Sequence, residues 1–329
     1  MKIKVLIIRF SSIGDIVLTT PVVRCIAQQL NEGDVEVHFL TKKSFSFILE
    51  NNPYVQKVYS IDKKVNEVAD ALENEHYDYV FDLHKNLRSS QAKKVTRALS
   101  FTFKKYNLHK WWYVNTKKNV MPDVHIVDRY FETTKAFKIK NDQEGLDYFI
   151  PEKDEVKLKE VPSFLHSGYI SYGIGGQHQG KILPTDKIIQ LLEKIPHPVA
   201  LIGGKEDEAR GDEIAQSGSH IWNACGAFNL NQSASIVKQS KVLIAHDTGI
   251  MHIGAALKKP VLSLWGATVP EFGMYPYLPG EGSEIFEPQG VKNRPYSKLG
   301  NKQWYKKPFT GMNNIDVEAV AKKANELFN

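Results

Sequence analysis

The sequence is poor in cysteine and has no long apolar run. Its 329 residues include two cysteines, Cys25 and Cys225, which lie far apart and show no metal-ligand spacing. This argues against a disulfide-stapled or cysteine-ligated zinc protein, so we expect a reduced, cytoplasmic protein. No stretch approaches the roughly 20 apolar residues that a membrane-spanning helix needs. Arg9 and Asp15 end the first apolar run too early for a signal peptide, so any membrane association should be peripheral.

A complete dinucleotide-binding glycine motif is also missing. Gly173 and Gly175 follow a predicted strand, but the next glycine is not at the spacing that the motif requires. A nicotinamide-dependent oxidoreductase is therefore disfavoured. The composition, 42% hydrophobic and 24% charged, is typical of a soluble globular protein, and no fixed-period repeat or low-complexity tract is present.

Acidic residues are absent from residues 84–122, which contain ten lysines or arginines. Such a charge run is most often a solvated face, yet its length without a carboxylate suggests a surface for a polyanion. Lipid phosphates, nucleic acid and an anionic saccharide all stay open. Trp111, Trp112 and Tyr113 lie in the same segment and favour a membrane interface or a sugar face over duplex DNA. The net charge of +6 permits an anionic partner without requiring one.

The rest of the chain alternates apolar, β-prone runs with helical patterns, which predicts parallel α/β sheets. Strands of the first sheet are expected at 4–10, 35–41, 55–59 and 79–83. We interpret the polar, charged stretch at 144–162 as a linker, after which a second series of strands begins. The predicted organisation is a Rossmann-like domain over 1–155, a second over 163–313, and a carboxy-terminal helix over 314–329 that could pack back toward the first domain.

The most informative stretch is Val242–Trp265, whose pattern predicts a strand, a helix and another strand. Asp247, Thr248 and Gly249 lie where the first strand meets the helix. Free N–H groups and the positive end of the helix dipole at such a position suit a phosphate. His252 follows Thr248 by four residues and shares its helix face. Simple helix capping is the alternative, but the combined pattern favours a binding site.

Two further loops follow predicted strands, at the sheet edge where ligands bind. Asp15 ends the turn 11–15 after the first strand, and it is either a functional carboxylate or a cap. Lys181 lies in the glycine-rich loop 175–181, where freed backbone amides and an ammonium group suit a phosphate. A solvated loop lysine is the alternative there.

Together these segments resemble glycosyltransferase family 9, the heptosyltransferases of bacterial lipopolysaccharide core synthesis. The resemblance rests on motifs that occur in the family's order along nearly the whole chain, and the first and last carry most of the weight. They are RFSSIGDIVLTTPVV at 9–23, VHIVDRY at 124–130, Lys181 with Pro184, GGKEDE at 203–208, and HDTGIMHIGAAL at 246–257 followed by PVLSLWGAT at 260–268.

The resemblance implies a GT-B fold, in which two facing Rossmann-like domains with parallel sheets have a cleft between them. It implies an inverting, metal-independent transfer of a sugar, usually heptose from ADP-heptose, to a lipid-linked core saccharide. Consistent with this, the chain has no Asp-x-Asp pair, which often holds a divalent ion in metal-dependent glycosyltransferases. By resemblance, Asp15 is the general base and Lys181 is a catalytic residue that contacts the donor phosphates.

The remaining site residues and partners follow from the same resemblance. Expected donor contacts are Gly176, Lys181, Gly204, Glu206, Asp247, Thr248, Gly249 and His252. Expected acceptor contacts are Ser12, Gly14, Lys85, Arg88, Lys93 and Arg129. The implied partners are a nucleotide-sugar donor, a phosphorylated lipid-linked acceptor and the cytoplasmic face of the inner membrane. Nucleic acid, metal and cofactor are not expected, and the protein should be a monomer.

Two departures from the family pattern concern the donor. Leu183 stands before Pro184 where an aromatic residue is common, and Lys205 follows the glycine pair where some members have an acid, with Glu206 next. Both leave the nucleotide base and the sugar open. A transferase using another nucleotide sugar, a same-fold nucleotide-sugar epimerase, and a non-catalytic module for anionic lipid, saccharide or nucleic acid are therefore the alternatives.

Overall fold

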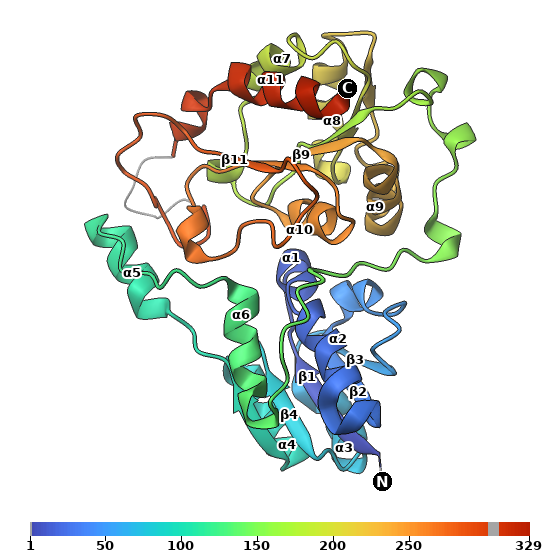
Figure 1. Cartoon of the computed structure of the whole chain (residues 1–329), viewed down its shortest axis with the longest axis vertical. Helices are drawn as coiled ribbons and strands as arrows, with labels where there is room; N and C mark the ends of the chain where they lie inside the picture. The colour runs from blue at the N-terminus through green and yellow to red at the C-terminus, as the bar shows by residue number, and fades with distance from the viewer. Residues whose placement is uncertain (1, 302–308) are drawn as a thin grey trace. The chain divides into compact units, whose positions relative to one another are not determined.

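The computed structural model describes residues 2–301 and 309–329, and the chain divides into two units (Figure 1). Unit 1 consists of Met1–Lys105 and Val124–Phe149, and unit 2 consists of Tyr106–Asp123 and Ile150–Asn329. The chain passes between the units three times, and the last passage, between Phe149 and Ile150, lies within the predicted linker. Residues 106–123, which the sequence analysis assigned to the first domain, group instead with unit 2.

Unit 1 is built on a five-stranded parallel sheet in the order β3-β2-β1-β4-β5. Its strands are β1 (Ile3–Ile8), β2 (Val35–Lys42), β3 (Lys57–Ile61), β4 (Tyr79–Asp82) and β5 (Leu99–Thr102). The central strand β1 is apolar along its length because it is covered on both faces, and Val5–Ile8 are fully buried. The four predicted strands are confirmed. The edge strand β5 was not predicted, because most of its residues are exposed and lack the apolar signal of a buried strand.

The helices of unit 1 are short. They are α1 (Ile13–Val17), α2 (Thr20–Gln29), α3 (Ala69–Asn74), α4 (Leu87–Thr96) and α6 (Ile126–Phe131). Two helices follow β1 in succession: α1 begins beside Gly14, and α2 begins at Thr20 with Pro21 in its first turn. Lys43–Ile48 and Glu132–Phe137 form 3-10 turns, and α6 precedes the second of them.

Unit 2 has a six-stranded parallel sheet in the order β11-β10-β9-β6-β7-β8. Its strands are β6 (Ile170–Gly173), β7 (Val199–Ile202), β8 (Ile221–Asn223), β9 (Val242–His246), β10 (Val261–Leu264) and β11 (Glu284–Phe286). Buried apolar residues fill the four inner strands, and these were predicted. The two edge strands, β8 and β11, have three residues each and were missed because a strand that short leaves almost no periodic pattern.

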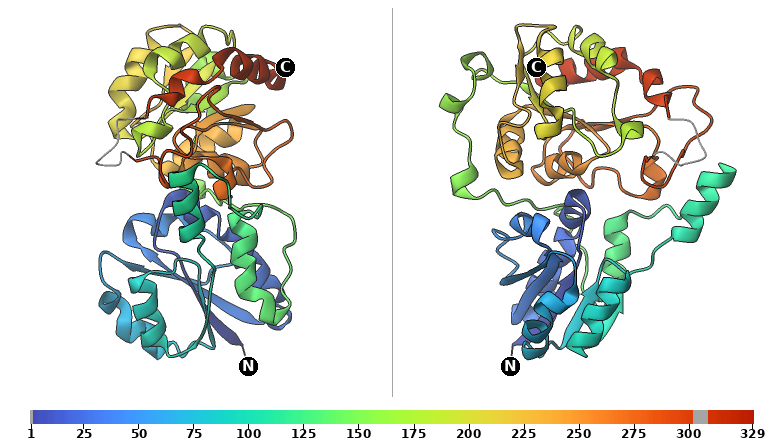
Figure 2. Two further views of the ribbon diagram at one scale, coloured as in Figure 1. Left: turned by 90° about the vertical axis from the view of Figure 1, so that its left-hand side faces the viewer. Right: turned by 180° about the vertical axis from the view of Figure 1, so that it is seen from behind.

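The helices of unit 2 include the carboxy-terminal helix. They are α5 (Asn107–Thr116), α7 (Thr185–Leu192), α8 (Glu208–Ala215), α9 (Leu230–Gln239), α10 (Gly249–Ala256) and α11 (Val317–Phe328). Helix α11 lies beside α7 and contacts β9 within unit 2 (Figures 1 and 2). Val320 and Ala324 on its apolar face are fully buried. Among the described residues, no helix is long and apolar enough to cross a membrane.

Both sheets reverse their winding direction at an inner pair of strands. In unit 1 the chain runs from β1 outward to β3 and then returns to β4 beside β1. In unit 2 it runs from β6 outward to β8 and then returns to β9 beside β6. At such a switch point the connections leave in opposite directions, and the carboxyl ends of the two strands form a crevice suited to a ligand.

Arg24 in helix α2 holds the segment 142–147 at the end of unit 1 against that helix. Its guanidinium donates to the two carboxylate oxygens of Asp142 at 2.7 and 2.9 Å and to the Gly145 carbonyl at 2.9 Å, and it also pairs with Asp147. Arg24 is buried. Its hydrogen bonds outweigh partial burial and lower the pKa of Asp142 to about 2.

We expect Arg24→Ala to lower the free energy of unfolding by about 3 kcal/mol, because two partly buried carboxylates lose their counter-charge. Urea denaturation followed by circular dichroism measures the change. Lys135→Ala is the matched control, because the Lys135–Glu132 pair is largely exposed and should contribute under about 0.5 kcal/mol. Equal effects of the two substitutions would show that Arg24 does not hold the segment in place.

Candidate active site

Asp15 lies at the switch point of unit 1, in the short helix that follows β1. Its Oδ2 accepts hydrogen bonds from the Ser12 backbone N–H at 3.0 Å and the Ser12 hydroxyl at 2.8 Å. Its Oδ1 pairs with a terminal nitrogen of Arg9 at 2.5 Å. From the sequence, Asp15 could be either a helix cap or a functional carboxylate, and its position in the structure is compatible with both. It forms a capping box with Ser12, yet its side chain keeps 21% exposure.

Arg9 is the buried support of this carboxylate and was not predicted as a site residue. Its Nε donates to the Ser11 carbonyl at 3.0 Å, and one terminal nitrogen donates to the Leu83 carbonyl at 2.6 Å and the Tyr130 hydroxyl at 3.0 Å. Burial disfavours its charge, but Asp15, Tyr130 and Asp82 outweigh burial and raise the pKa of the guanidinium. An opposite charge this close favours the ionised form of Asp15.

Asp82 ends the neighbouring strand β4 and organises the loop after it. Its Oδ1 accepts the backbone N–H groups of His84 and Lys85 at 3.0 and 2.7 Å. Its Oδ2 accepts from the Ser89 hydroxyl at 2.8 Å and lies 3.2 Å from the Lys93 ammonium. Asp82 is fully buried, so its carboxylate fixes the start of α4 and has no surface left for a ligand.

His84 and Lys105 complete the surroundings of Arg9. Burial, together with Arg9 and Lys105, lowers the pKa of His84 to about 4, so the imidazole is neutral at pH 7. Burial, followed by Arg9, lowers the pKa of Lys105, whose ammonium donates to the Lys85 carbonyl at 3.2 Å. The sequence analysis listed neither residue as a site residue.

The expected acceptor residues divide into two groups. Ser12 and Lys85 are exposed, and Arg88 lies over the Phe10 ring, 5.6 Å from its centroid. Gly14 is buried in α1 and contributes backbone only.

Two of the expected acceptor residues are committed to the fold. Lys93 pairs with Asp82 and donates to the Thr102 hydroxyl at 2.9 Å. Arg129 is buried, and its guanidinium donates to the Val124 carbonyl at 3.0 and 2.7 Å, which ties down the start of α6. A sequence motif cannot distinguish an arginine that supports its own helix from one that meets a ligand.

Lys181 and Asp247 come together at the switch point of unit 2. The Lys181 ammonium lies 2.7 Å from Asp247 Oδ2 and donates to the Asp247 carbonyl at 3.1 Å. Thr268, in the loop after β10, donates its hydroxyl proton to the same Oδ2 at 2.7 Å. The side chain of Asp247 is the more buried partner, with 9% exposure against 17% for Lys181. Asp247 therefore holds Lys181 in position, and Thr268 holds Asp247.

The start of α10 lies next to this pair. Helix geometry leaves its first four N–H groups without intrahelical acceptors, and the Thr248 side chain does not cap them, since its hydroxyl donates to the His246 carbonyl at 3.3 Å. Gly176 lies against Thr248, so that an added Cβ would come within 3.3 Å of the Thr248 methyl group. His252 is buried one turn into the helix. The predicted loop and helix start are thus brought together, and they offer amides and an ammonium to an anion.

His246, the last residue of β9, supports the loop that carries Lys181. It was not predicted as a site residue. Its Nε2 accepts the backbone N–H of Leu183 at 3.0 Å, so the ring holds the loop after Lys181 against β9. The residue is fully buried. Burial, followed by Arg210, lowers the pKa of His246 to about 3, and the ring is therefore neutral. Leu183, where the family commonly has an aromatic residue, is buried in the core.

The end of β7 holds the remaining expected donor residues. Gly204 and Glu206 are exposed, and the Glu206 carboxylate folds over Gly204, where an added Cβ would lie 2.5 Å from a carboxylate oxygen. The buried Asp207 accepts the Gly204 N–H at 3.0 Å, and burial raises the pKa of Asp207. Glu206 is thus free to reach a ligand, whereas Asp207 shapes the loop.

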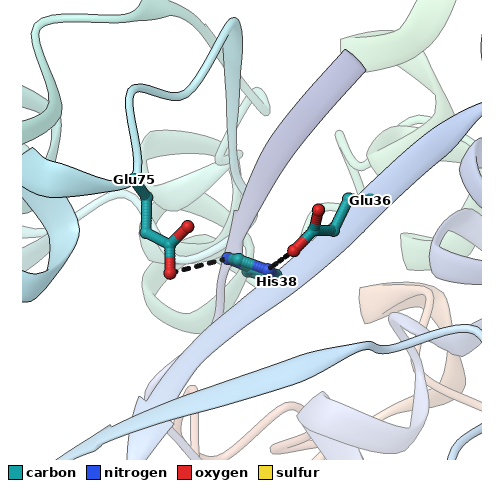
Figure 3. A group of neighbouring side chains, drawn as sticks. All are labelled: Glu36, His38 and Glu75. Atoms are coloured by element: carbon teal, nitrogen blue, oxygen red, sulfur yellow. Dashed lines mark hydrogen bonds and ion pairs between the residues drawn. The ribbon is translucent and has the colours of Figure 1, made fainter. Parts of the chain in front are cut away.

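A second polar cluster lies at the opposite edge of the unit 1 sheet, near the start of β2 (Figure 3). His38 Nε2 lies 2.7 Å from Glu36, and its Nδ1 lies 2.9 Å from the Tyr77 hydroxyl and 3.9 Å from Glu75. Glu75 also pairs with Lys4 at 2.6 Å and Lys57 at 2.7 Å. Because two ammonium groups already pair with Glu75, we interpret the cluster as a structural charge network rather than a metal site.

Comparisons with known proteins identify the family of the chain. The family model for glycosyltransferase family 9 (heptosyltransferase) matches residues 65–280, more than half of the chain. Lipopolysaccharide heptosyltransferase 1 of Campylobacter coli is 24% identical over 297 residues, which cover 80% of this chain and 84% of the relative.

Solved structures show the same fold. The glycosyl transferase family 9 protein of Veillonella parvula superposes with a TM-score of 0.80 at 20% identity, over 100% of this chain and 98% of that one. A heptosyltransferase of Escherichia coli, solved with ADP, gives 0.71 at 20% identity over 98% and 99%. The predicted fold class is confirmed.

We expect His246→Leu to lower the free energy of unfolding at pH 7.5 by roughly 1–3 kcal/mol, because the buried Leu183 N–H loses its acceptor. The folded pKa of about 3 lies below the unfolded value of about 6.5. The stability contributed by neutral His246 is therefore complete above about pH 6.5 and is lost as the pH falls toward 3.

The variant lacks this imidazole, so its own stability does not depend on the protonation of residue 246. The difference in free energy of unfolding between the unsubstituted protein and the variant should therefore narrow between pH 7.5 and pH 5 in urea denaturation. His76→Asn, at an exposed position, is the control and should change neither value appreciably. A deficit that stays constant with pH would contradict a neutral, buried His246.

Proposed function

The chain belongs to glycosyltransferase family 9 and is a glycosyltransferase, and we propose that it moves heptose from ADP-heptose onto a lipid-linked saccharide of the lipopolysaccharide core. We further propose that the transfer inverts the anomeric centre and needs no metal ion. The E. coli relative solved with ADP supports an adenine nucleotide as the leaving group. The donor, the stereochemistry and the metal independence are each open to test.

The observation that carries the proposal is the support of Asp15. A general base must be ionised, fixed in position and reachable. Arg9 favours the ionised form of Asp15, Ser12 fixes one of its oxygens, and part of the side chain stays exposed. Asp15 would accept the proton of the acceptor hydroxyl as that oxygen attacks the anomeric carbon, and the bond from that carbon to the diphosphate oxygen would break.

The leaving diphosphate would be stabilised by unit 2. Lys181 supplies a fixed positive charge, and the N–H groups at the start of α10 supply hydrogen bonds and the positive end of a dipole. Since these groups are held in position before the substrate binds, little reorganisation is needed during the reaction. Gly176 and His252 line the same region, and Glu206 at the end of β7 is available to the donor's sugar or ribose hydroxyls.

The acceptor would meet cations of unit 1, of which Lys85 is exposed and Arg88 is half-buried. Lys85 and Arg88 lie in the acid-free segment, close in sequence to the loop that Asp82 organises. They suit the phosphate groups of a core saccharide, and Ser12 lies at the base itself. A lipid-linked acceptor would require a monomeric cytoplasmic enzyme to work at the inner face of the inner membrane.

We expect Asp15→Asn to reduce kcat by a factor of about 10²–10⁴, because an amide cannot take the acceptor proton. The affinity for ADP-heptose should change little, since the proposed donor contacts lie in unit 2. Product formation and calorimetric donor binding measure the two effects. Asp34→Asn, which removes an exposed carboxylate of unit 1 before β2, should leave both unchanged. Loss of donor binding together with turnover would count against the base role.

We also expect turnover to persist in excess EDTA, because Lys181 and the α10 amides would provide the charge that a divalent ion supplies in other enzymes. The test is the rate of product formation after dialysis against chelator, with Lys181→Ala as the variant that should lose turnover. Activity that disappears with chelator and returns with added metal would refute the metal-independent mechanism.

A further inference from the structure

Helix α5 has one face committed to packing within unit 2. Tyr113 and Val114 are buried and form an apolar cluster with Val269 and Phe272. The Lys110 ammonium lies 5.0 Å from the centroid of the Phe272 ring. At the end of the helix the Lys117 ammonium donates to the Pro295 carbonyl at 2.7 Å. These contacts hold α5 in place and fix which side of it faces outward.

The opposite face of α5 presents large apolar side chains to solvent. Leu108 is 73% exposed, Trp111 51% and Trp112 46%. Their spacing of three and four residues puts them on one side of the helix, about opposite to Tyr113 and Val114. Single exposed apolar residues are ordinary, but a leucine and two tryptophans on one helical face mark an interaction site.

The surroundings of this face are cationic. No acid occurs between His84 and Pro122, and Lys104 and Lys118 flank the helix in sequence as exposed residues. Tryptophan rings favour the boundary between lipid headgroups and acyl chains, and lysines near it are attracted to anionic headgroups. A second copy of this chain would bring the same positive charge against itself, whereas an anionic bilayer complements it.

We propose that the Leu108–Trp111–Trp112 face of α5 docks the enzyme on an anionic lipid bilayer, with the two tryptophans at the headgroup boundary. The helix would lie in the plane of the interface rather than cross it, in keeping with its ten residues. The docking surface rests on the proposed function only for its purpose, which is to bring the enzyme to a lipid-linked acceptor.

The test is co-sedimentation of the full chain with vesicles of phosphatidylcholine containing 30% phosphatidylglycerol (about one lipid in three anionic), compared with phosphatidylcholine alone. We expect binding at least about tenfold tighter to the anionic vesicles, weakening as salt is raised. Trp111→Ser with Trp112→Ser should lower that binding about tenfold or more, with an unchanged melting temperature. Quenching of tryptophan fluorescence by brominated lipid should fall in the same variant.

The matched control is Leu158→Ser with Phe164→Ser, which removes exposed apolar side chains elsewhere in unit 2 and should leave vesicle binding unchanged. Equal loss in both variants, equal binding to neutral vesicles, or a dimer that the tryptophan substitutions dissociate would each overturn the docking surface. ADP binding is measured in parallel. Vesicle binding without ADP binding would reject the proposed function and leave the docking surface standing, whereas the reverse would reject only the docking surface.

Discussion

The reversal of winding within each parallel sheet is the constraint on which the candidate site of each unit depends. Parallel strands end at one edge, and only at the switch point do the following connections diverge and leave room for a ligand. In unit 1 this point lies between β1 and β4, which lead into Asp15 and Asp82. In unit 2 it lies between β6 and β9, which lead into Lys181 and Asp247. Residues distant in sequence are therefore neighbours because of strand order.

The candidate site of each unit contains one ion pair, and the two pairs differ in which partner is the more buried. In unit 1 the cation Arg9 is the more buried partner, at 10% exposure, and the carboxylate of Asp15 is the more accessible, at 21%. In unit 2 the carboxylate of Asp247 is the more buried, at 9%, and the cation of Lys181 is the more accessible, at 17%. The buried member fixes its partner, and our proposal assigns the chemistry to the more accessible member. A carboxylate suits a proton to be removed, and an ammonium suits a phosphate to be released.

The parts of the molecule that could be predicted from the sequence are those that depend on short, contiguous residue patterns. The inner strands are buried apolar runs; Asp247 stands directly after one of them, and Asp15 and Lys181 lie in the connections that follow two others. The supports of these residues are not local. Arg9 reaches Leu83 and Tyr130, Thr268 reaches Asp247, and His246 holds Leu183, through contacts that arise only after the sheets form. For the same reason, the burial of Arg129 and the use of Lys93 by Asp82 could not be predicted from composition.

The acid-free segment, residues 84–122, shows that a run of cations in the sequence does not by itself form a charged surface. Several of its cations serve the fold: Lys93 neutralises Asp82, Lys105 donates to the Lys85 carbonyl, and Lys117 donates to the Val114 and Pro295 carbonyls. What distinguishes the segment is therefore less its number of cations than its own lack of carboxylates. Helix α5 adds direction to that charge. Because Tyr113 and Val114 pack against unit 2, helix geometry places the two tryptophans on the solvent side. The order of residues in α5 therefore determines which face meets the bilayer in our proposal.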